Sequence, residues 1–157
     1  MNTAFTRFGS YALGQPIAEH PEAKGETLLD KLLATDKVPG EKRYRTQGHV
    51  EFLRGTWFVW LHVFEGRIFR LYATWSTKLQ APMVAMHLEV IDYCRVHLGG
   101  DMSGSKETGL TWKTDFGTVA VTTDINIHTY RGSAVTDQDY YVHIDSTAQP
   151  LSALTKL

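Results

Sequence analysis

The chain has 157 residues, 43% of them hydrophobic, and a formal net charge of −1. A length of this order is typical of one domain, so we expect residues 1–157 to fold as a single unit around one apolar core. The near-zero charge provides no general attraction to nucleic acid or anionic lipid, and we expect neither as a partner.

No segment approaches the roughly 18 consecutive apolar residues of a membrane-spanning helix, and the first residues lack the apolar core of a signal peptide. These features favour a cytoplasmic protein. Cys94 is the single cysteine, which excludes an intrachain disulfide and a zinc site built from several cysteines. We therefore expect no cofactor and no structural metal.

The stretch from His49 to Trp75 has the densest apolar and aromatic content. Within it, only His62 interrupts an apolar run over residues 57–64. Alternation along a strand would place aromatic or apolar groups on both faces of this run, which is typical of a central strand. Gly55 and Gly66 supply turn residues on either side. The pattern predicts a three-strand antiparallel meander over residues 44–75, with strands near Tyr44–Leu53, Trp57–Phe64 and Arg67–Trp75.

One earlier stretch and several later ones complete the predicted elements. Leucines recur at helical spacing between Glu26 and Ala34, which predicts a short amphipathic helix. A proline suits the first turn of a helix and a glycine its end, so the main helix should span residues 82–98. Strand-like alternation resumes at Leu110–Thr123 and Asp139–Ser146, with a further strand between them. Residues 150–157 favour a short closing helix.

The order of these elements predicts an α+β fold. We expect a mainly antiparallel sheet of about five to six strands, with the main helix and one or two short helices packed on it. A barrel-like closure of the sheet around a pocket is the alternative.

A metal site on the main helix is one candidate for function. His87, Cys94 and His97 share one stripe of this helix, and Cys94 and His97 are close enough in sequence to bind one ion. Zinc normally requires three or four ligands with supporting hydrogen bonds, and no fourth ligand is evident. Burial at the margin of the apolar helix face explains the stripe better.

A polar row on a late strand is another candidate. Tyr141, His143 and Asp145 would share one strand face, and such a row could support acid–base chemistry because histidine titrates near neutral pH. The same alternation fits the solvated face of a half-buried strand. The chain also contains no recognised catalytic motif, so we lean against an enzyme.

A pocket could also form around the central strand. Trp60, His62, Arg70 and Tyr72 would then surround an aromatic or anionic ligand between the sheet and the main helix. Otherwise His62 is a core residue whose ring nitrogens find partners. The pocket is the basis of an alternative function, that of a small-ligand-binding protein or an enzyme.

Charge is distributed unevenly along the chain. Residues 37–70 contain seven basic and three acidic residues, whereas residues 115–145 contain five aspartates against Arg131 alone. Two regions of opposite charge on one molecule can steer a charged partner. Pairing of these charges across the sheet is the alternative explanation.

From these features we expect a non-enzymatic protein-binding module of the bacterial immunity or inhibitor type, which binds and blocks a partner protein such as a toxin or effector. The expected contact surface combines acidic loops with tyrosine anchors, because tyrosine is enriched at interface hot spots. Its residues are Asp124, Tyr130, Asp137, Asp139 and Tyr140. A homo-oligomer that pairs through a sheet edge or a Trp-rich face is a further hypothesis.

Overall fold

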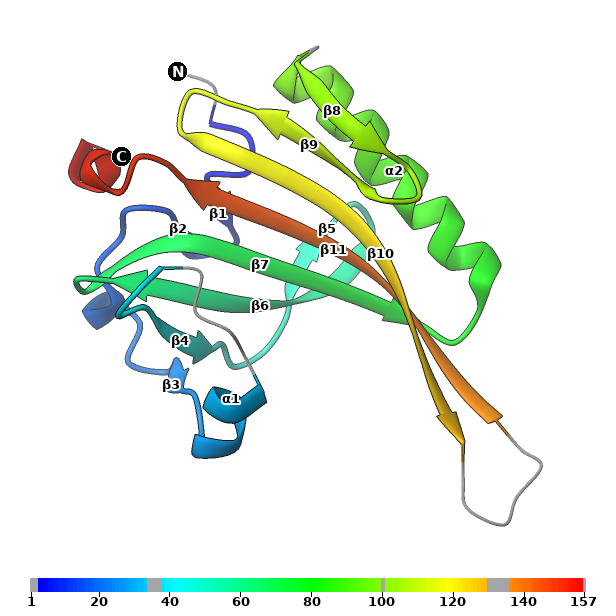
Figure 1. The fold of residues 1–157 in the computed structure, drawn as a ribbon, viewed down its shortest axis with the longest axis horizontal. Coiled ribbons are helices and arrows are strands. Elements are labelled where there is room, and N and C mark those ends of the chain that lie inside the picture. The colour runs from blue at the N-terminus through cyan, green and yellow to red at the C-terminus, as the bar shows by residue number, and fades with distance from the viewer. Residues whose placement is uncertain (1–2, 34–37, 100, 130–135, 157) are drawn as a thin grey trace.

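The computed structural model describes residues 3–33, 38–99, 101–129 and 136–156. Within these residues the main feature is a nine-stranded antiparallel sheet (Figure 1). The strand order is β3-β4-β6-β7-β11-β10-β9-β8, and β5 also pairs with β6. The strands are β3 (Lys24–Gly25), β4 (Lys42–Arg45), β5 (Val50–Phe52), β6 (Gly55–Phe64), β7 (Arg67–Thr77), β8 (Met102–Ser105), β9 (Gly109–Lys113), β10 (Gly117–Thr129) and β11 (Thr136–Ala148).

The remaining elements are a small separate hairpin and the helices. They are β1 (Arg7–Phe8), β2 (Tyr11–Ala12), α1 (Leu28–Leu33), α2 (Gln80–Leu98) and the 3₁₀ helices η1 (Ile17–Glu19) and η2 (Leu151–Lys156). The expected α+β class, with a mainly antiparallel sheet and one main helix, is confirmed. The expected five to six strands are too few, because the described residues contain eleven. Several strands are only two to four residues long, too short to produce a recognisable alternation.

Among the described residues, no helix combines the length and the apolar character that crossing a membrane requires.

The first strand of the predicted meander is in fact two strands, β4 and β5, which pair with successive parts of β6. Residues 46–49 belong to neither strand, and Gly48 there has a φ of 84°, which glycine adopts readily. Thr46 donates its hydroxyl to the carbonyl oxygen of Val59 at 2.8 Å, which holds this interruption against β6. The apolar run alone does not indicate the break.

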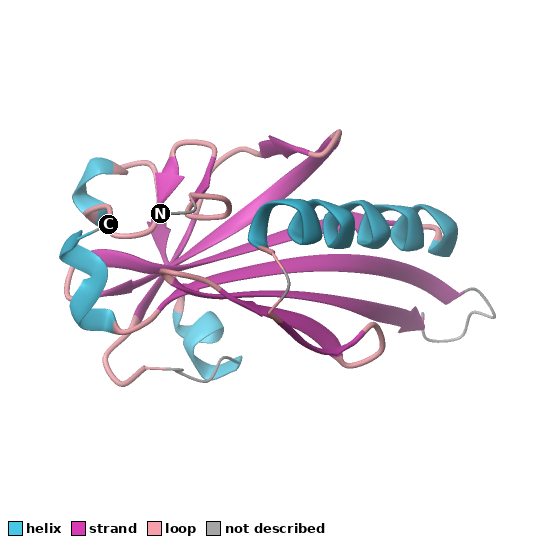
Figure 2. Ribbon diagram, turned by 90° about the horizontal axis from the view of Figure 1, so that it is seen from above, coloured by secondary structure: helices cyan, strands magenta, loops and turns pink. Residues whose placement is uncertain are grey.

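Side chains of the central strands alternate between two faces of the sheet, and α2 covers one of them (Figure 2). The covered face is filled by fully buried residues, which include Trp57, Leu61, Leu71, Val121 and Ile144. On α2 the buried residues of the same core are Met83, Met86, Val90, Ile91 and Cys94. We call the opposite face, which carries Trp60, Tyr72 and Asp145, the open face.

A β-bulge adds a large apolar side chain to the open face. His62 pairs with Arg70 and Val63 pairs with Ile68, so Phe69 is an extra residue on β7. The extra residue shifts the alternation, and Ile68 is buried in the core. The ring of Phe69 lies against that of His62, with centroids 6.3 Å apart.

β10 and β11 form a hairpin that is longer than the strands beside it. The two strands pair along their whole lengths, from Gly117 opposite Ala148 to Thr129 opposite Thr136. In the described structure, β9 pairs only with residues 118–121, and β7 only with residues 140–147. Residues 126–129 and 136–139 therefore project as a two-stranded extension (Figure 1). We call this extension, together with Asp124 and Ile125 at its base, the arm.

α1 lies within the predicted helix 26–34, but its leucines do not pack on the sheet as expected. The exposed fractions of Leu28, Leu29 and Leu32 are 75%, 64% and 75%. Reciprocal hydrogen bonds stabilise the first turn instead: Asp30 donates its N–H to the hydroxyl of Thr27, and Thr27 donates its N–H to the carboxylate of Asp30. Local capping therefore defines this helix.

Gly117 provides a test of the hairpin register. It has a φ of 152°, and a Cβ atom there would meet the carbonyl oxygen of Thr147. We predict that Gly117→Ala lowers the free energy of unfolding by about 3 kcal/mol or more, through strain and clash. Gly66→Ala is the matched control, because its φ of 79° is also positive but no atom lies within 4 Å of the added carbon.

The control should lose only about 1 kcal/mol, the cost of the left-handed conformation. Denaturant unfolding measures both variants. Equal losses for Gly117→Ala and Gly66→Ala would contradict the register.

Candidate functional site

The open face brings together residues that the sequence places on separate strands. Trp60 and His62 come from β6, Arg70 and Tyr72 from β7, and Tyr141, His143 and Asp145 from β11. The register places Tyr72 opposite both Trp60 and Asp145, so the two sets form one surface. Because α2 packs on the other face, a ligand site at these residues would open on the uncovered side of the sheet and not beneath the main helix.

An ion pair joins β7 to β11 at the centre of this face. Arg70 donates from Nε to Oδ1 of Asp145 at 2.7 Å and from Nη2 to Oδ2 at 2.6 Å. The two side chains are only 9% and 16% exposed. Thr147 donates another hydrogen bond to Oδ1. Bidentate pairing of this kind is strong and directional, so the carboxylate is held in one orientation.

A second polar network surrounds the buried carboxylate of Glu41. This carboxylate lies 3.2 Å from Nδ1 of His62 and 3.5 Å from Nη1 of Arg43. Arg43 also donates from Nε to Glu26 at 2.7 Å. Burial, together with the charge of Arg70, lowers the pKa of His62 to about 4, against the opposing effect of Glu41. His62 is therefore neutral at pH 7.

The rings of Tyr72, His143 and Tyr141 stack in a row across β7 and β11. The centroid distances are 5.3 Å between Tyr72 and His143 and 5.7 Å between His143 and Tyr141. Burial lowers the pKa of His143, whose Nδ1 lies 2.9 Å from the hydroxyl of Thr74. The row presents planar, uncharged groups, which suit recognition by contact.

The open face is hollowed beside the Arg70–Asp145 pair. This open-face hollow has a volume of about 420 Å³. Its lining combines apolar side chains with hydroxyl, amide and carboxylate groups, from Val38, Phe69, Thr111, Thr118, Ala120, Asp145, Thr147 and Gln149. Strands β7, β9, β10 and β11 all contribute, so most of the lining is held by the sheet.

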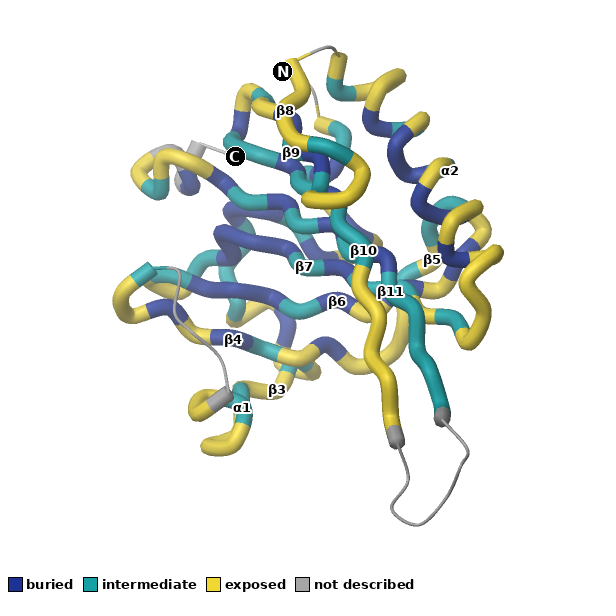
Figure 3. The backbone as a smooth tube through the Cα atoms, turned by 45° about the vertical axis from the view of Figure 1, so that its right-hand side comes forward, coloured by how far each residue is buried: buried dark blue, intermediate teal, exposed yellow. Residues whose placement is uncertain are grey.

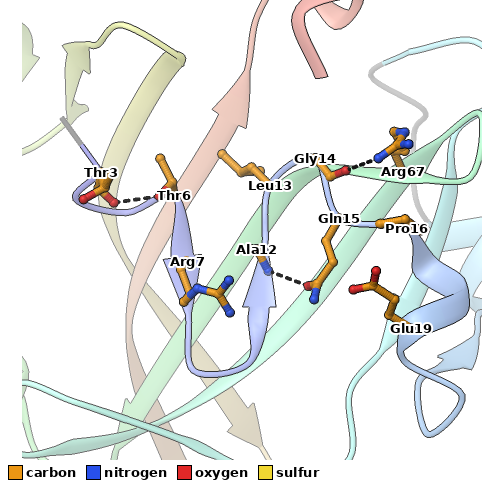
Figure 4. A pocket seen from close by; sticks show the side chains of 10 residues that line it. All are labelled: Thr3, Thr6, Arg7, Ala12, Leu13, Gly14, Gln15, Pro16, Glu19 and Arg67. Carbon is orange, nitrogen blue, oxygen red and sulfur yellow. Dashed lines mark hydrogen bonds between the residues drawn. The ribbon is translucent and has the colours of Figure 1, made fainter. Parts of the chain in front are cut away.

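Another hollow, of about 460 Å³, lies beside the N-terminal hairpin (Figure 4). Arg67 donates there to the carbonyl oxygen of Gly14 at 2.7 Å, and Gln15 accepts a hydrogen bond from the N–H of Ala12. Arg7 and Glu19 are exposed. Because its polar groups either bind the backbone or belong to exposed side chains, this hollow is a weaker candidate than the open-face hollow.

The arm carries three aspartates of the expected partner surface. Asp137 and Asp139 both pair with Lys78, at 2.9 and 2.7 Å, which raises the pKa of Lys78. Asp139 also lies 3.3 Å from Nε2 of His128. Asp124 accepts a hydrogen bond from the N–H of the next residue. The acidic face of the arm is thus partly neutralised by the chain itself.

The other face of the arm is apolar. Ile125 lies opposite Tyr140, and Ile127 opposite Gln138. The isoleucines are 48% and 58% exposed, and Figure 3 shows β10 exposed along the arm. Tyr140 lies partly against the core, whereas Tyr130 is outside the described residues. The isoleucines are not recognisable as contact residues from the sequence, because their alternation with polar residues is typical of any half-buried strand.

The candidate metal ligands on α2, which are His87, Cys94 and His97, have packing roles. Cys94 is fully buried and His87 is 7% exposed. Burial raises the pKa of the Cys94 thiol to about 12. The ring of His97 lies against Tyr93, with centroids 4.0 Å apart. Among the residues that the structure describes, no three His, Cys, Asp or Glu side chains are grouped closely enough to hold a metal ion.

Comparison of the chain with protein-family models, with curated proteins and with solved structures gives no match. The open face and the arm are therefore the basis for assigning a function.

His62 should make stability depend on pH. Its pKa is lowered from the ordinary value of 6.5 to about 4 in the folded chain. Between these values the unfolded chain binds more protons, so the stability that neutral His62 provides is lost as pH falls from 6.5 towards 4. We predict that the wild type loses about 3 kcal/mol more than His62→Gln over this window. Denaturant unfolding at several pH values measures this; parallel pH profiles would contradict the buried environment of His62.

The Arg70–Asp145 pair should show strong coupling. Removing one partner leaves a buried charge without its counter-ion, so Arg70→Met and Asp145→Asn should each lower the free energy of unfolding by about 2–4 kcal/mol. The double variant should lose at least about 1 kcal/mol less than the sum of the two. A double-mutant cycle by denaturant unfolding measures the coupling, and additive losses would contradict a direct interaction.

Proposed function

We propose that this chain is a protein-binding module that acts by binding and blocking a partner protein, in the manner of bacterial immunity and inhibitor proteins. The observation that carries the proposal is the exposure of Ile125 and Ile127 on a projecting two-stranded arm. A two-stranded hairpin without further support is only marginally stable in water, and exposed strand edges with apolar residues promote association. A partner that covers this face would stabilise the hairpin and would shield its apolar residues from non-specific association.

The two faces of the arm would have different roles in this interaction. Ile125, Ile127 and the neighbouring Tyr140 would form the apolar centre of the contact, where most binding energy is concentrated. Asp124, Asp137 and Asp139 lie on the opposite face and would steer a basic partner, which affects the rate of association more than the affinity. We assign the aspartates to steering and not to affinity because Asp137 and Asp139 already pair with Lys78 of the chain itself.

A double substitution on the arm tests the proposal. Ile125→Ser with Ile127→Ser removes the apolar contact, and we expect the affinity for the partner to fall by at least about tenfold. The fold should persist, because both side chains are largely exposed. Val96→Ser is the matched control, since Val96 is 78% exposed but lies on α2, away from the arm.

The measurement is affinity capture from a lysate of the source cells by the tagged chain, followed by calorimetry with the purified partner. Wild type and Val96→Ser should retain the same stoichiometric protein, and the double variant should lose it. Capture of no stoichiometric protein by the wild type, or full retention by the double variant, would contradict the proposal.

A further inference from the structure

The open-face hollow has the dimensions and construction of a small-molecule site. Its volume of about 420 Å³ falls within the range of roughly 300–1,000 Å³ that is common for such sites. Strands β9, β10 and β11 provide one side of it, and Phe69 in the bulge of β7 provides an apolar wall together with Val38.

The charges at the hollow favour an uncharged ligand. Asp145 is the one charged residue among the described residues that line it. Both of its carboxylate oxygens accept hydrogen bonds from Arg70. A negatively charged ligand would be repelled by this carboxylate, and a positively charged ligand would compete with Arg70 for it.

Hydroxyl groups dominate the rest of the polar lining. Thr111 and Thr118 have no side-chain hydrogen-bond partner in the part of the chain that the structure describes, and a hydroxyl can both donate and accept. Thr147 donates to Asp145 and keeps its oxygen lone pairs available. Ala120 lies opposite Thr111 on the neighbouring strand, and its small side chain leaves room for a ring.

We propose that the open-face hollow binds the ring of a neutral sugar, either a free monosaccharide or the ribose of a nucleoside. The threonine hydroxyls and Asp145 hydrogen-bond to the ring hydroxyls, while Val38 and Phe69 contact the C–H groups of the ring. Such a site discriminates against a ring with one hydroxyl or none, because most of its own polar groups would then lack partners. The site lies away from the arm and does not depend on the proposed protein partner.

NMR titration of the isotope-labelled full chain tests this inference, with D-glucose, D-galactose, D-ribose, adenosine and uridine as probes. At least one probe at millimolar concentration should shift the amide resonances of residues 111, 118, 120, 145 and 147. Monosaccharides and nucleosides, titrated separately, distinguish the two sources of the sugar ring. Cyclohexanol and inorganic phosphate should leave these resonances in place.

Substitutions inside and outside the open-face hollow test whether the active probe binds there. Thr118→Val keeps the side-chain shape but removes a hydroxyl, and should raise the Kd of the active probe by roughly three- to tenfold. Thr122→Val is the matched control, because Thr122 lies on β10 outside the lining of the hollow. Ala120→Leu should abolish binding by filling the hollow, and this variant decides the test if Thr118→Val does not fold.

Three results would overturn the inference. The first is that no sugar or nucleoside shifts the five resonances. The second is that phosphate or cyclohexanol shifts them as strongly as the sugars do. The third is that Thr118→Val, or Ala120→Leu in its place, binds as tightly as Thr122→Val.

Discussion

One long helix covers one face of a nine-stranded sheet, and no second long helix covers the other face in the described structure. This asymmetry determines which buried side chains need other stabilising contacts. Side chains that point away from α2 are stabilised without a second long helix above them. The Arg70–Asp145 pair and the contacts of Glu41 with His62 and Arg43 meet this need, because each buried charge has an opposite charge or a hydrogen-bonding group beside it. These polar contacts connect β4, β6, β7 and β11 across the open face.

The same asymmetry distinguishes the residues that form the buried core from those that form the candidate functional surfaces. The covered face is closely filled, with Trp57, Leu71 and Ile144 fully buried. The two candidate surfaces both lie on the β10–β11 hairpin. One end of the hairpin contributes to the open-face hollow, and the other end projects as the arm. Protein binding at the arm and sugar binding at the hollow would therefore use different parts of one supersecondary element.

Period-two alternation predicts a large part of this arrangement from the sequence. It places Trp60 and His62 on one face of the central strand, and Tyr141, His143 and Asp145 on one face of a later strand. Proline and glycine positions predict the main helix closely. These features are local, since each depends on residues within one element.

The features that the sequence does not reveal are non-local. No pattern in β11 indicates that it pairs with β7, so the contact between Arg70 and Asp145 comes from the strand order alone. The sequence likewise does not show that β10 extends beyond β9, where Ile125 and Ile127 are exposed. Glu41 follows the turn at Pro39 and Gly40 in the sequence, yet it is buried because His62 and Arg43 pair with it.

Hydroxyl-radical footprinting of the native chain, with mass-spectrometric readout by residue, tests most directly whether α2 covers one face and leaves the other open. Phe58 and Trp57 are adjacent in β6 but face opposite sides, with exposed fractions of 51% and 0%. The structure predicts rapid modification of Phe58 and protection of Trp57 until the chain unfolds. Modification of Trp57 at a rate similar to that of Phe58 would show that the faces are wrongly assigned, and the hollow and the arm would then lose their structural basis.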